Sequence, residues 1–326
     1  MMYTLPNRSH WQGRKTNPDL GIQYWYQAIE FLNINDIGTI ANKNKPDIAI
    51  LGYACDEGVR RNFGRLGAKK GPDATRERLA KVAFHLDTKK IVDVGNIVCV
   101  NENMESCQNE FAETITKLLN KSIFPIAIGG GHDIAYGHFK GIWNAVNNTP
   151  KNKIGIINFD AHFDLRSIET QPNSGTPFNQ ILSQYANETD YFAIGIQQQA
   201  NTKELFDIAK KYRVDYILHD ACELTDLPNA YSKLSSFVTT HDWIYITIDL
   251  DGFSSAYAPG VSAPSPLGFS PSFVCKVLAY LLKTKKVIAC DIAELNPEFD
   301  KDNTTATLAA RLVDFIAKNR YVKLTK

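Results

Sequence analysis

Short apolar stretches rich in β-branched residues recur along most of the chain, and longer amphipathic segments separate several of them. The stretches are continuous rather than alternating, which is typical of strands buried on both faces of a parallel sheet. They cover residues 48–51, 91–94, 124–128, 154–159, 192–196, 214–218, 244–248 and 287–292. Intervening segments such as 109–120 and 271–283 have the length and composition of amphipathic helices. The pattern predicts a three-layer α/β/α fold around a mostly parallel sheet of about eight strands.

The organisation of the chain favours one domain. Its 326 residues can bury one large core, and no repeat, low-complexity tract or long linker divides them. We therefore predict a single domain over residues 1–326. Residues 171–175 and 257–266 carry enough Gly, Pro and Ser to form surface loops, and loops so placed often shape a binding site.

Composition narrows the class of protein. The hydrophobic fraction is 44%, the charged fraction is 22% and the formal net charge is +1, which implies neither a nucleic-acid nor a membrane-surface partner. Met1–Arg14 lacks the hydrophobic region of a secretory signal, and no segment approaches the roughly 18 apolar residues of a membrane span. The six cysteines form neither close pairs nor a dense scaffold. We expect a cytoplasmic protein that acts on a small molecule, and a homo-oligomer is compatible with this composition.

Three of the predicted strands lead directly into acids and imidazoles. Residues 124–128 precede Gly-Gly-Gly-His-Asp at 129–133, residues 154–159 precede Asp-Ala-His-Phe-Asp at 160–164, and residues 244–248 precede Asp-Leu-Asp at 249–251. In an open parallel sheet, ligands bind beyond the carboxyl ends of the strands. These three strand ends are therefore the first place to expect a functional site.

The residue types at these strand ends suit divalent metal ions. Alternate positions of an extended segment point to one side, so Asp160, His162 and Asp164 can converge, and Asp249 and Asp251 repeat the arrangement. Carboxylate oxygen with imidazole nitrogen suits Mn²⁺, Fe²⁺, Co²⁺ or Zn²⁺, and four aspartates balance the charge of two such ions. The predicted ligands are His132, Asp160, His162, Asp164, Asp249 and Asp251.

Each motif taken alone has a simpler interpretation. A histidine after a glycine run is often a hydrogen-bonded loop residue, and Asp-x-Asp at a strand end is often a helix cap or a turn. Three ligand-bearing strand ends in one sheet are hard to explain by caps and turns, which favours the metal site. Two metals can share a water and lower its pKa from about 15.7 to near neutrality, which predicts a hydrolase. Asp164 is placed to hydrogen-bond that water and to carry its proton.

The three motifs, in this order, resemble those of the arginase and agmatinase family, the ureohydrolases. The third motif continues as Gly-Phe-Ser-Ser-Ala-Tyr-Ala-Pro-Gly-Val-Ser-Ala-Pro to residue 264, and the resemblance extends from about Ile48 to Ile316. It implies an arginase-like fold, two Mn²⁺ ions per chain held by the six predicted ligands, and hydrolysis of a linear amidine or guanidine.

Within that family the chain is most similar to the formimidoylglutamase branch. The similarity lies in Asp56–Asn62, Asp164–Arg166, Ser174–Phe178 and Gly195–Gln197. It implies cleavage of N-formimidoyl-L-glutamate to L-glutamate and formamide, a step of histidine degradation. Phe178 stands where arginases carry a proton-moving histidine, which argues against arginase activity. The alternatives are another ureohydrolase, such as an agmatinase or guanidinobutyrase, and a non-catalytic relative that binds metal.

The substrate implied by this resemblance carries two carboxylates, which need cationic partners. Arg166, two residues beyond Asp164, is the candidate for a bidentate clamp, and Arg60, Arg61 or Arg65 could supply a second contact. The alternative for each arginine is a weak surface salt bridge.

Glu294 follows the predicted strand 287–292 and matches the family position that receives the cationic nitrogen of the substrate. Its alternative is a position in the first turn of a helix near Asn296 and Pro297. Ser174 and Gly175 are predicted to contact the substrate through main-chain or hydroxyl groups. Asp164 and Glu294 are thus the predicted catalytic residues.

Overall fold

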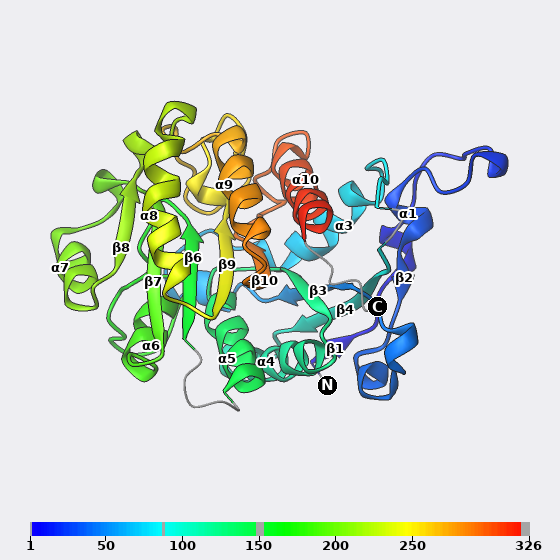
Figure 1. Cartoon of the computed structure of the whole chain (residues 1–326), viewed down its shortest axis with the longest axis horizontal. Helices are drawn as coiled ribbons and strands as arrows, with labels where there is room; N and C mark the ends of the chain where they lie inside the picture. Colours follow the sequence, from blue (N-terminus) through cyan, green and yellow to red (C-terminus); the bar gives the residue numbers. More distant parts are fainter. Residues whose placement is uncertain (1, 87–88, 148–152, 321–326) are drawn as a thin grey trace.

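A ten-stranded sheet runs through the middle of the molecule (Figure 1). The computed structural model describes residues 2–86, 89–147 and 153–320. Along the sheet the strands follow the order β1-β4-β3-β5-β10-β9-β6-β7-β8, and β2 also pairs with β4. Their bounds are β1 Tyr3–Thr4, β2 Glu30–Phe31, β3 Ile48–Ala54, β4 Ile91–Val98, β5 Phe124–Ile128, β6 Ile154–Phe159, β7 Thr189–Ile196, β8 Asp215–Leu218, β9 Trp243–Asp249 and β10 Val287–Ala293. Every pair is parallel except β1 with β4.

The eight predicted strands are confirmed as β3 to β10. The two further strands, β1 and β2, have two residues each, which is too short for a hydrophobic pattern to reveal. The predicted single domain over residues 1–326 includes residues outside the described ranges and stays a prediction.

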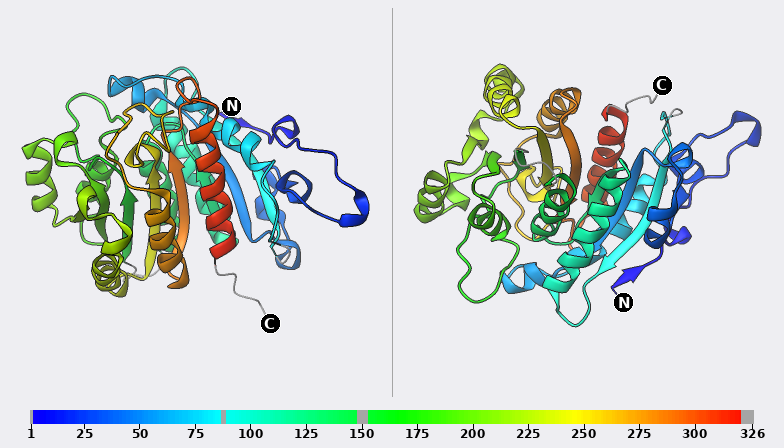
Figure 2. Two further views of the ribbon diagram at one scale, coloured as in Figure 1. Left: turned by 90° about the horizontal axis from the view of Figure 1, so that it is seen from above. Right: turned by 60° about the horizontal axis from the view of Figure 1, so that its bottom comes forward.

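Helices cover both faces of the sheet, as the two views of Figure 2 show. Their bounds are α1 Trp25–Ala28, α2 Glu57–Arg61, α3 Gly71–Leu79, α4 Met104–Asn120, α5 Ile134–Val146, α6 Pro177–Gln184, α7 Lys203–Lys211, α8 Leu227–Thr239, α9 Pro271–Lys283 and α10 Thr304–Asn319. Helices α3, α8, α9 and α10 contribute to one buried cluster, whereas α4 to α7 contribute to the other. The three predicted layers are therefore present.

The predicted helix 271–283 matches α9, but the predicted helix 109–120 begins five residues too late. Helix α4 starts at Met104 because the side-chain oxygen of Asn103 accepts a hydrogen bond from the backbone N–H of Ser106 at 3.0 Å. Asparagine at this position satisfies a donor that would otherwise lack a partner in the first turn. Among the described residues, no helix has both the length and the apolar character needed to cross a membrane.

The amino-terminal segment packs against the edge of the sheet that carries β4 (Figure 1). Trp25 is fully buried, and its indole N–H donates to Asp314 of α10 at 2.8 Å. Trp11 donates to Asp93 of β4 at 2.8 Å, and Asp93 also pairs with the buried Arg76 at 2.9 Å. The hydrogen bonds of the two buried indole groups tie this segment to α10 and to β4.

Candidate metal centre

The carboxyl ends of four adjacent central strands surround one site. In the order β5-β10-β9-β6, these strands lead to His132, Glu294, Asp249 and Asp160. Asp249 is the last residue of β9, and the other three lie within four residues of the end of their strand. Strands β5 and β6 lie on either side of the β10–β9 pair, although they are consecutive along the chain. The parallel topology therefore brings three motifs that are far apart in sequence to one edge of the sheet.

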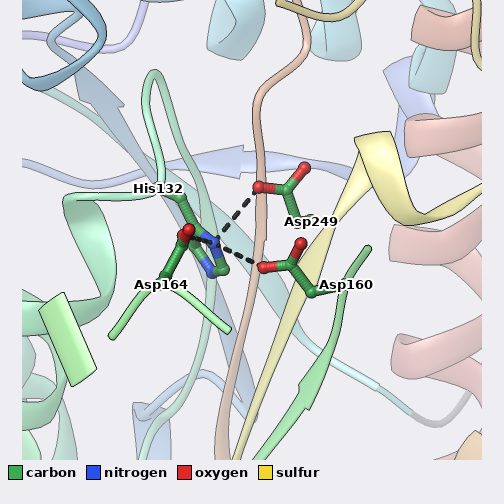
Figure 3. A group of neighbouring side chains, drawn as sticks. All are labelled: His132, Asp160, Asp164 and Asp249. Atoms are coloured by element: carbon green, nitrogen blue, oxygen red, sulfur yellow. Dashed lines mark hydrogen bonds and ion pairs between the residues drawn. The ribbon is translucent and has the colours of Figure 1, made fainter. Parts of the chain in front are cut away.

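The six predicted ligands lie together as two groups that share Asp160. In the first group, His132 Nδ1 lies 3.1 Å from Asp160, 2.9 Å from Asp164 and 3.1 Å from Asp249 (Figure 3). In the second group, His162 Nδ1 lies 3.4 Å from Asp160 and 3.2 Å from Asp251. The two oxygens of Asp160 face the two histidines separately. One carboxylate can thus serve two cations.

The reason predicted for this convergence is wrong. Residues 160–164 are not extended: Asp160 accepts a hydrogen bond from the backbone N–H of His162 at 2.7 Å, and Asp164 has a φ of +48°. Asp251 lies in the short 3₁₀ helix Leu250–Gly252, and its N–H donates to Asp249 at 2.8 Å. Tight turns therefore aim the ligands, at two neighbouring points rather than one.

Burial opposes the ionisation of Asp249 and Asp251 in the absence of a counter-charge. Burial, then repulsion from Asp251 and Asp160, raises the pKa of Asp249 well above its usual range. Burial raises the pKa of Asp251 to about 6, although His162 pulls it down. The buried Oδ1 of Asp251 also has no hydrogen-bond partner among the described residues. Cations would offset this desolvation and repulsion, and the nitrogen and oxygen donors fit Mn²⁺.

A buried chain of polar groups lies behind His132. Its Nε2 is 3.0 Å from the hydroxyl of Thr247, which donates to Asp291 at 2.6 Å. Asp291 also accepts from Tyr245 and pairs with His138 at 2.6 Å. Because the single hydroxyl proton of Thr247 goes to Asp291, Thr247 accepts from His132. The Nε2 of His132 therefore carries the proton, and Nδ1 keeps its lone pair for a metal.

Thr247 and Asp291 were not among the predicted site residues, although the sequence carries a signal for them. Both are polar residues inside otherwise apolar strands, and they are register partners on β9 and β10. A buried polar group in such a strand needs a hydrogen-bond partner. The adjacent strand is the nearest place for such a hydrogen-bond partner.

We expect Thr247→Val to raise the Mn²⁺ dissociation constant of the His132 group about 10- to 100-fold, since groups behind metal-binding histidines have effects of this size. Titration with Mn²⁺, followed by electron paramagnetic resonance of the free ion, measures it. Thr189→Val is the control, because the buried hydroxyl of Thr189 has no hydrogen-bond partner among the described residues. Unchanged Mn²⁺ affinity in Thr247→Val would contradict this role.

Glu294 faces the same site with one oxygen free. Its Oε1 accepts from the backbone N–H of His132 at 2.8 Å, and its buried Oε2 has no partner in the described part of the chain. The residue has a φ of +68°, a conformation that costs energy for a side chain other than glycine. Burial, followed by repulsion from Asp251, raises the pKa of Glu294 to about 8. An acceptor held this way is suited to a cationic ligand.

Two cavities lead to the site. An inner cavity of about 320 Å³ is lined by both histidine ligands, Asp164, Asp249, Asp251 and Glu294. An outer cavity of about 530 Å³ lies toward residues 60–63 and 166–173. Arg166 lines both, and its guanidinium has no ion-pair or hydrogen-bond partner among the residues described. A positive charge is therefore available where the two cavities meet.

Arg60 and Arg61, which were predicted to contact the substrate, already form ion pairs with glutamates. Arg60 binds Glu57 at 2.6 Å and approaches Glu102 at 3.3 Å. Arg61 binds Glu57 at 2.8 Å and Glu105 at 2.6 Å. Both line only the outer of the two cavities. The charges of Arg60 and Arg61 are therefore balanced by nearby glutamates. Among the described arginines that line the two cavities, only Arg166 remains without an ion pair or a hydrogen bond to its guanidinium.

Arg65 also has a structural role. Its guanidinium donates to the carbonyl oxygens of Ser262 at 3.0 Å and Val261 at 2.5 Å, and lies over the ring of Phe299. These contacts join the early loop to the loop that follows Asp251. They leave Arg65 little capacity to bind a carboxylate.

Ser174, Gly175 and Phe178 occupy different layers of the site. Ser174 lines the inner cavity, and its hydroxyl accepts from Asn62 at 3.1 Å. Gly175 lies behind Arg166. Its carbonyl accepts a hydrogen bond from the backbone N–H of Arg166 at 2.9 Å, and a Cβ on Gly175 would lie 3.1 Å from the Arg166 side chain. Phe178 is fully buried, stacks on Tyr191 at 4.3 Å and contacts the His132 ring. Phe178 supports His132 rather than lining either cavity.

Comparison with known proteins identifies the family of this chain. Curated formimidoylglutamases from Geobacillus kaustophilus and Rhodococcus jostii are 40% and 41% identical to this chain, and each alignment covers 95% of both proteins. The crystal structure of Bacillus subtilis formimidoylglutamase matches with a TM-score of 0.81 at 21% identity, over 94% of each chain. A Trypanosoma cruzi formiminoglutamase with Mn²⁺₂ matches with a TM-score of 0.74 at 25% identity, over 88% of this chain and 98% of that one. Residues 46–317 match the arginase family. The chain therefore belongs to the arginase family.

Proposed function

We propose that the protein is a formimidoylglutamase that holds two Mn²⁺ ions and hydrolyses N-formimidoyl-L-glutamate to L-glutamate and formamide. The relatives that carry this name align over nearly the whole chain. The observation that carries the proposal is one cavity with a free carboxylate oxygen on Glu294 at the ligand end and an unpaired guanidinium on Arg166 at the outer end. This polarity matches a substrate with a cationic formimidoyl group at one end and two carboxylates at the other.

The first ion would be held by His132, Asp160, Asp164 and Asp249, and the second by Asp160, His162 and Asp251. When bound, the two ions supply Lewis acidity that makes a water molecule nucleophilic near neutral pH. The chain supplies the remaining functions: it orients the substrate, excludes bulk water and moves protons.

Hydrolysis adds the oxygen of water to the formimidoyl carbon and breaks the bond from that carbon to the glutamate nitrogen. Glu294 Oε2 orients the terminal formimidoyl nitrogen, because it is the unpaired acceptor beside the ligands. The carboxylate of Asp164 takes one proton of the attacking water and delivers it to the departing amino nitrogen, and the second water proton passes to the same nitrogen as the carbonyl of formamide forms. Arg166 holds a carboxylate of the glutamate portion. The products are formamide and L-glutamate, and no other reactant is needed.

A panel of four substrates tests the proposal: N-formimidoyl-L-glutamate, L-arginine, agmatine and 4-guanidinobutyrate, each with Mn²⁺, with Zn²⁺ and with chelator. We expect turnover of the first compound with Mn²⁺ and loss of that turnover with chelator. Agmatine has no carboxylate and gives Arg166 nothing to bind. Urea released from agmatine, with formimidoylglutamate left intact, would overturn the substrate assignment. Metal-loaded protein without turnover of any of the four would indicate a non-catalytic relative.

We expect Arg166→Met to raise KM about 10- to 100-fold while kcat changes by less than about fivefold, since a charged hydrogen bond to a carboxylate contributes about 1.5–3 kcal/mol. Steady-state kinetics on N-formimidoyl-L-glutamate separate the two constants. Arg60→Met is the matched control, because the Arg60 charge is already paired with Glu57. A fall in kcat at unchanged KM would mean that Arg166 does not anchor the substrate.

The proposal extends to location. All six cysteines are free thiols, and four of them are buried, which suits the reducing environment of the cytoplasm. The partner that the site supports is the small-molecule substrate.

A further inference from the structure

The segment Gly195–Asn201, which comprises the last two residues of β7 and the turn after it, has no part in the proposed mechanism but contacts the backbone of the second ligand motif. The backbone N–H of Gln197 donates to the carbonyl of Ala161 at 3.0 Å. The side chain of Asn201 also donates to Ala161 O, at 2.9 Å, and its oxygen accepts from the N–H of Phe163 at 3.0 Å. Its remaining N–H donates to the carbonyl of Gln197 at 2.8 Å. One carboxamide thus uses its full set of donors on the backbone.

These contacts hold the chain on both sides of His162. Residues 160–164 lie outside the strands, so the backbone groups of Ala161 and Phe163 have no ladder partners there. The two histidine ligands also differ in support. His132 has Thr247 behind it, whereas no described residue hydrogen-bonds the Nε2 of His162. The direction of the His162 side chain therefore depends on its backbone.

The same segment also contacts the loop that follows the third ligand motif. The Gln197 carboxamide hydrogen-bonds the hydroxyl of Ser265 through both its nitrogen, at 2.7 Å, and its oxygen, at 2.9 Å. Ser265 belongs to the loop that follows Asp249–Asp251, and its carbonyl accepts from Ser255. Gln197 and Asn201 are 4% and 6% exposed, so these hydrogen bonds are shielded from water.

Gly195 allows the segment to approach this closely. It has a φ of +100°, and a Cβ there would lie 3.0 Å from the carbonyl oxygen of Asp160 and 2.5 Å from the ring of Phe269. Glycine alone fits both the conformation and the space. Gly195–Gln197 is one of the segments that resemble the formimidoylglutamase branch. Its glycine is needed because the segment lies against residues 160–164 and supports them.

We propose that Asn201 is a positioning residue that, together with Gln197, fixes the backbone around His162 and so sets the second metal group, His162 with Asp160 and Asp251. This inference rests on the ligand assignment made in the proposed function. It assigns Asn201 no contact with the reacting atoms.

The test measures Mn²⁺ binding to the full chain. We expect Asn201→Leu to bind one Mn²⁺ with nearly normal affinity and the second about 10- to 100-fold more weakly. Its kcat should fall at micromolar Mn²⁺ and recover toward wild type at millimolar Mn²⁺, with KM for the substrate nearly unchanged. A raised KM at saturating Mn²⁺, with both affinities normal, would instead make Asn201 a substrate contact and overturn the proposal.

Two further variants guard against a simple loss of folding. Asn201→Asp keeps the shape and the acceptor for Phe163 but removes both donors, so it should impair the second ion much as Asn201→Leu does. If the side chain only fills space, Asn201→Asp would bind both ions normally. Ser265→Ala frees the Gln197 side chain and should weaken the same ion less strongly.

Trp25→Phe is the matched control for stability, since it removes one part-buried hydrogen bond, from helix α1 to Asp314, and α1 lies beside the β4 edge of the sheet and away from the metal centre. It should lower the unfolding temperature and leave both Mn²⁺ affinities intact. Equal weakening of the second ion in Trp25→Phe and Asn201→Leu would refute a specific role for Asn201. Wild-type protein that fails to bind two ions would overturn the ligand assignment, and with it the positioning role of Asn201 and Gln197.

Discussion

Replacing Asp160 by alanine is expected to eliminate binding of both Mn²⁺ ions and to lower kcat/KM for N-formimidoyl-L-glutamate by about 1000-fold or more, as loss of the activated water requires. The two oxygens of Asp160 face different histidines, at 3.1 Å and 3.4 Å, so both groups depend on one carboxylate. Metal analysis after gel filtration should find fewer than one Mn²⁺ per chain, against two in the wild type.

The fold should survive this substitution. Asp160 repels the buried Asp249 and Asp251, so its removal relieves part of the electrostatic cost of the metal-free protein. We expect metal-free Asp160→Ala to unfold at a temperature no lower than that of metal-free wild type. His162→Ala is the comparison, because it removes a ligand of the second group only and should keep one ion. Two ions retained by Asp160→Ala would contradict the shared carboxylate.

The clustering of the six His and Asp side chains could be predicted because its signal is local. Each motif follows a continuous apolar strand, and parallel strands that meet in one sheet bring their carboxyl ends to one edge. The hydrophobic pattern does not predict the direction in which each ligand side chain points. The left-handed backbone of Asp164 and the 3₁₀ turn at Asp251 depend on the surrounding packing, so the ligands form two groups rather than the single convergence expected from alternation.

The sequence does not reveal partners that are distant along the chain. Arg60 and Arg61 are neutralised in part by Glu102 and Glu105, which are more than 40 positions away, and no spacing rule links them. Asn201 was passed over for the same reason, since it serves a backbone about 40 residues earlier. Arg166 and Gly175 were predicted as separate contacts, but they form one unit in which Gly175 backs the arginine. The sign of each charge can be read from the sequence, whereas the partner that neutralises it is known only from the fold.

Glu294→Gln is expected to lower kcat/KM for N-formimidoyl-L-glutamate about 100- to 1000-fold, the size of effect seen when one group aimed at developing charge is removed. Glutamine keeps the acceptor that binds the His132 N–H, but it puts an amide nitrogen where the free Oε2 stands. A donor there would meet the N–H groups of the formimidoyl end, so the interaction becomes repulsive as well as uncharged. Steady-state kinetics at saturating Mn²⁺ measure the loss.

Metal binding and folding should separate this role from that of a ligand. Glu294 lies outside both ligand groups, so Glu294→Gln should keep two Mn²⁺ ions. Because it removes a buried, unpartnered carboxylate, it should unfold at or above the wild-type temperature. Glu298→Gln, at an exposed glutamate four residues away that pairs with Lys70, is the matched control and should leave kcat/KM unchanged. If Glu294→Gln retained kcat/KM within about fivefold of wild type, the cationic end of the substrate would have to bind elsewhere in the inner cavity, and Asp251, whose Oδ1 is also unpartnered, would be the next residue to test.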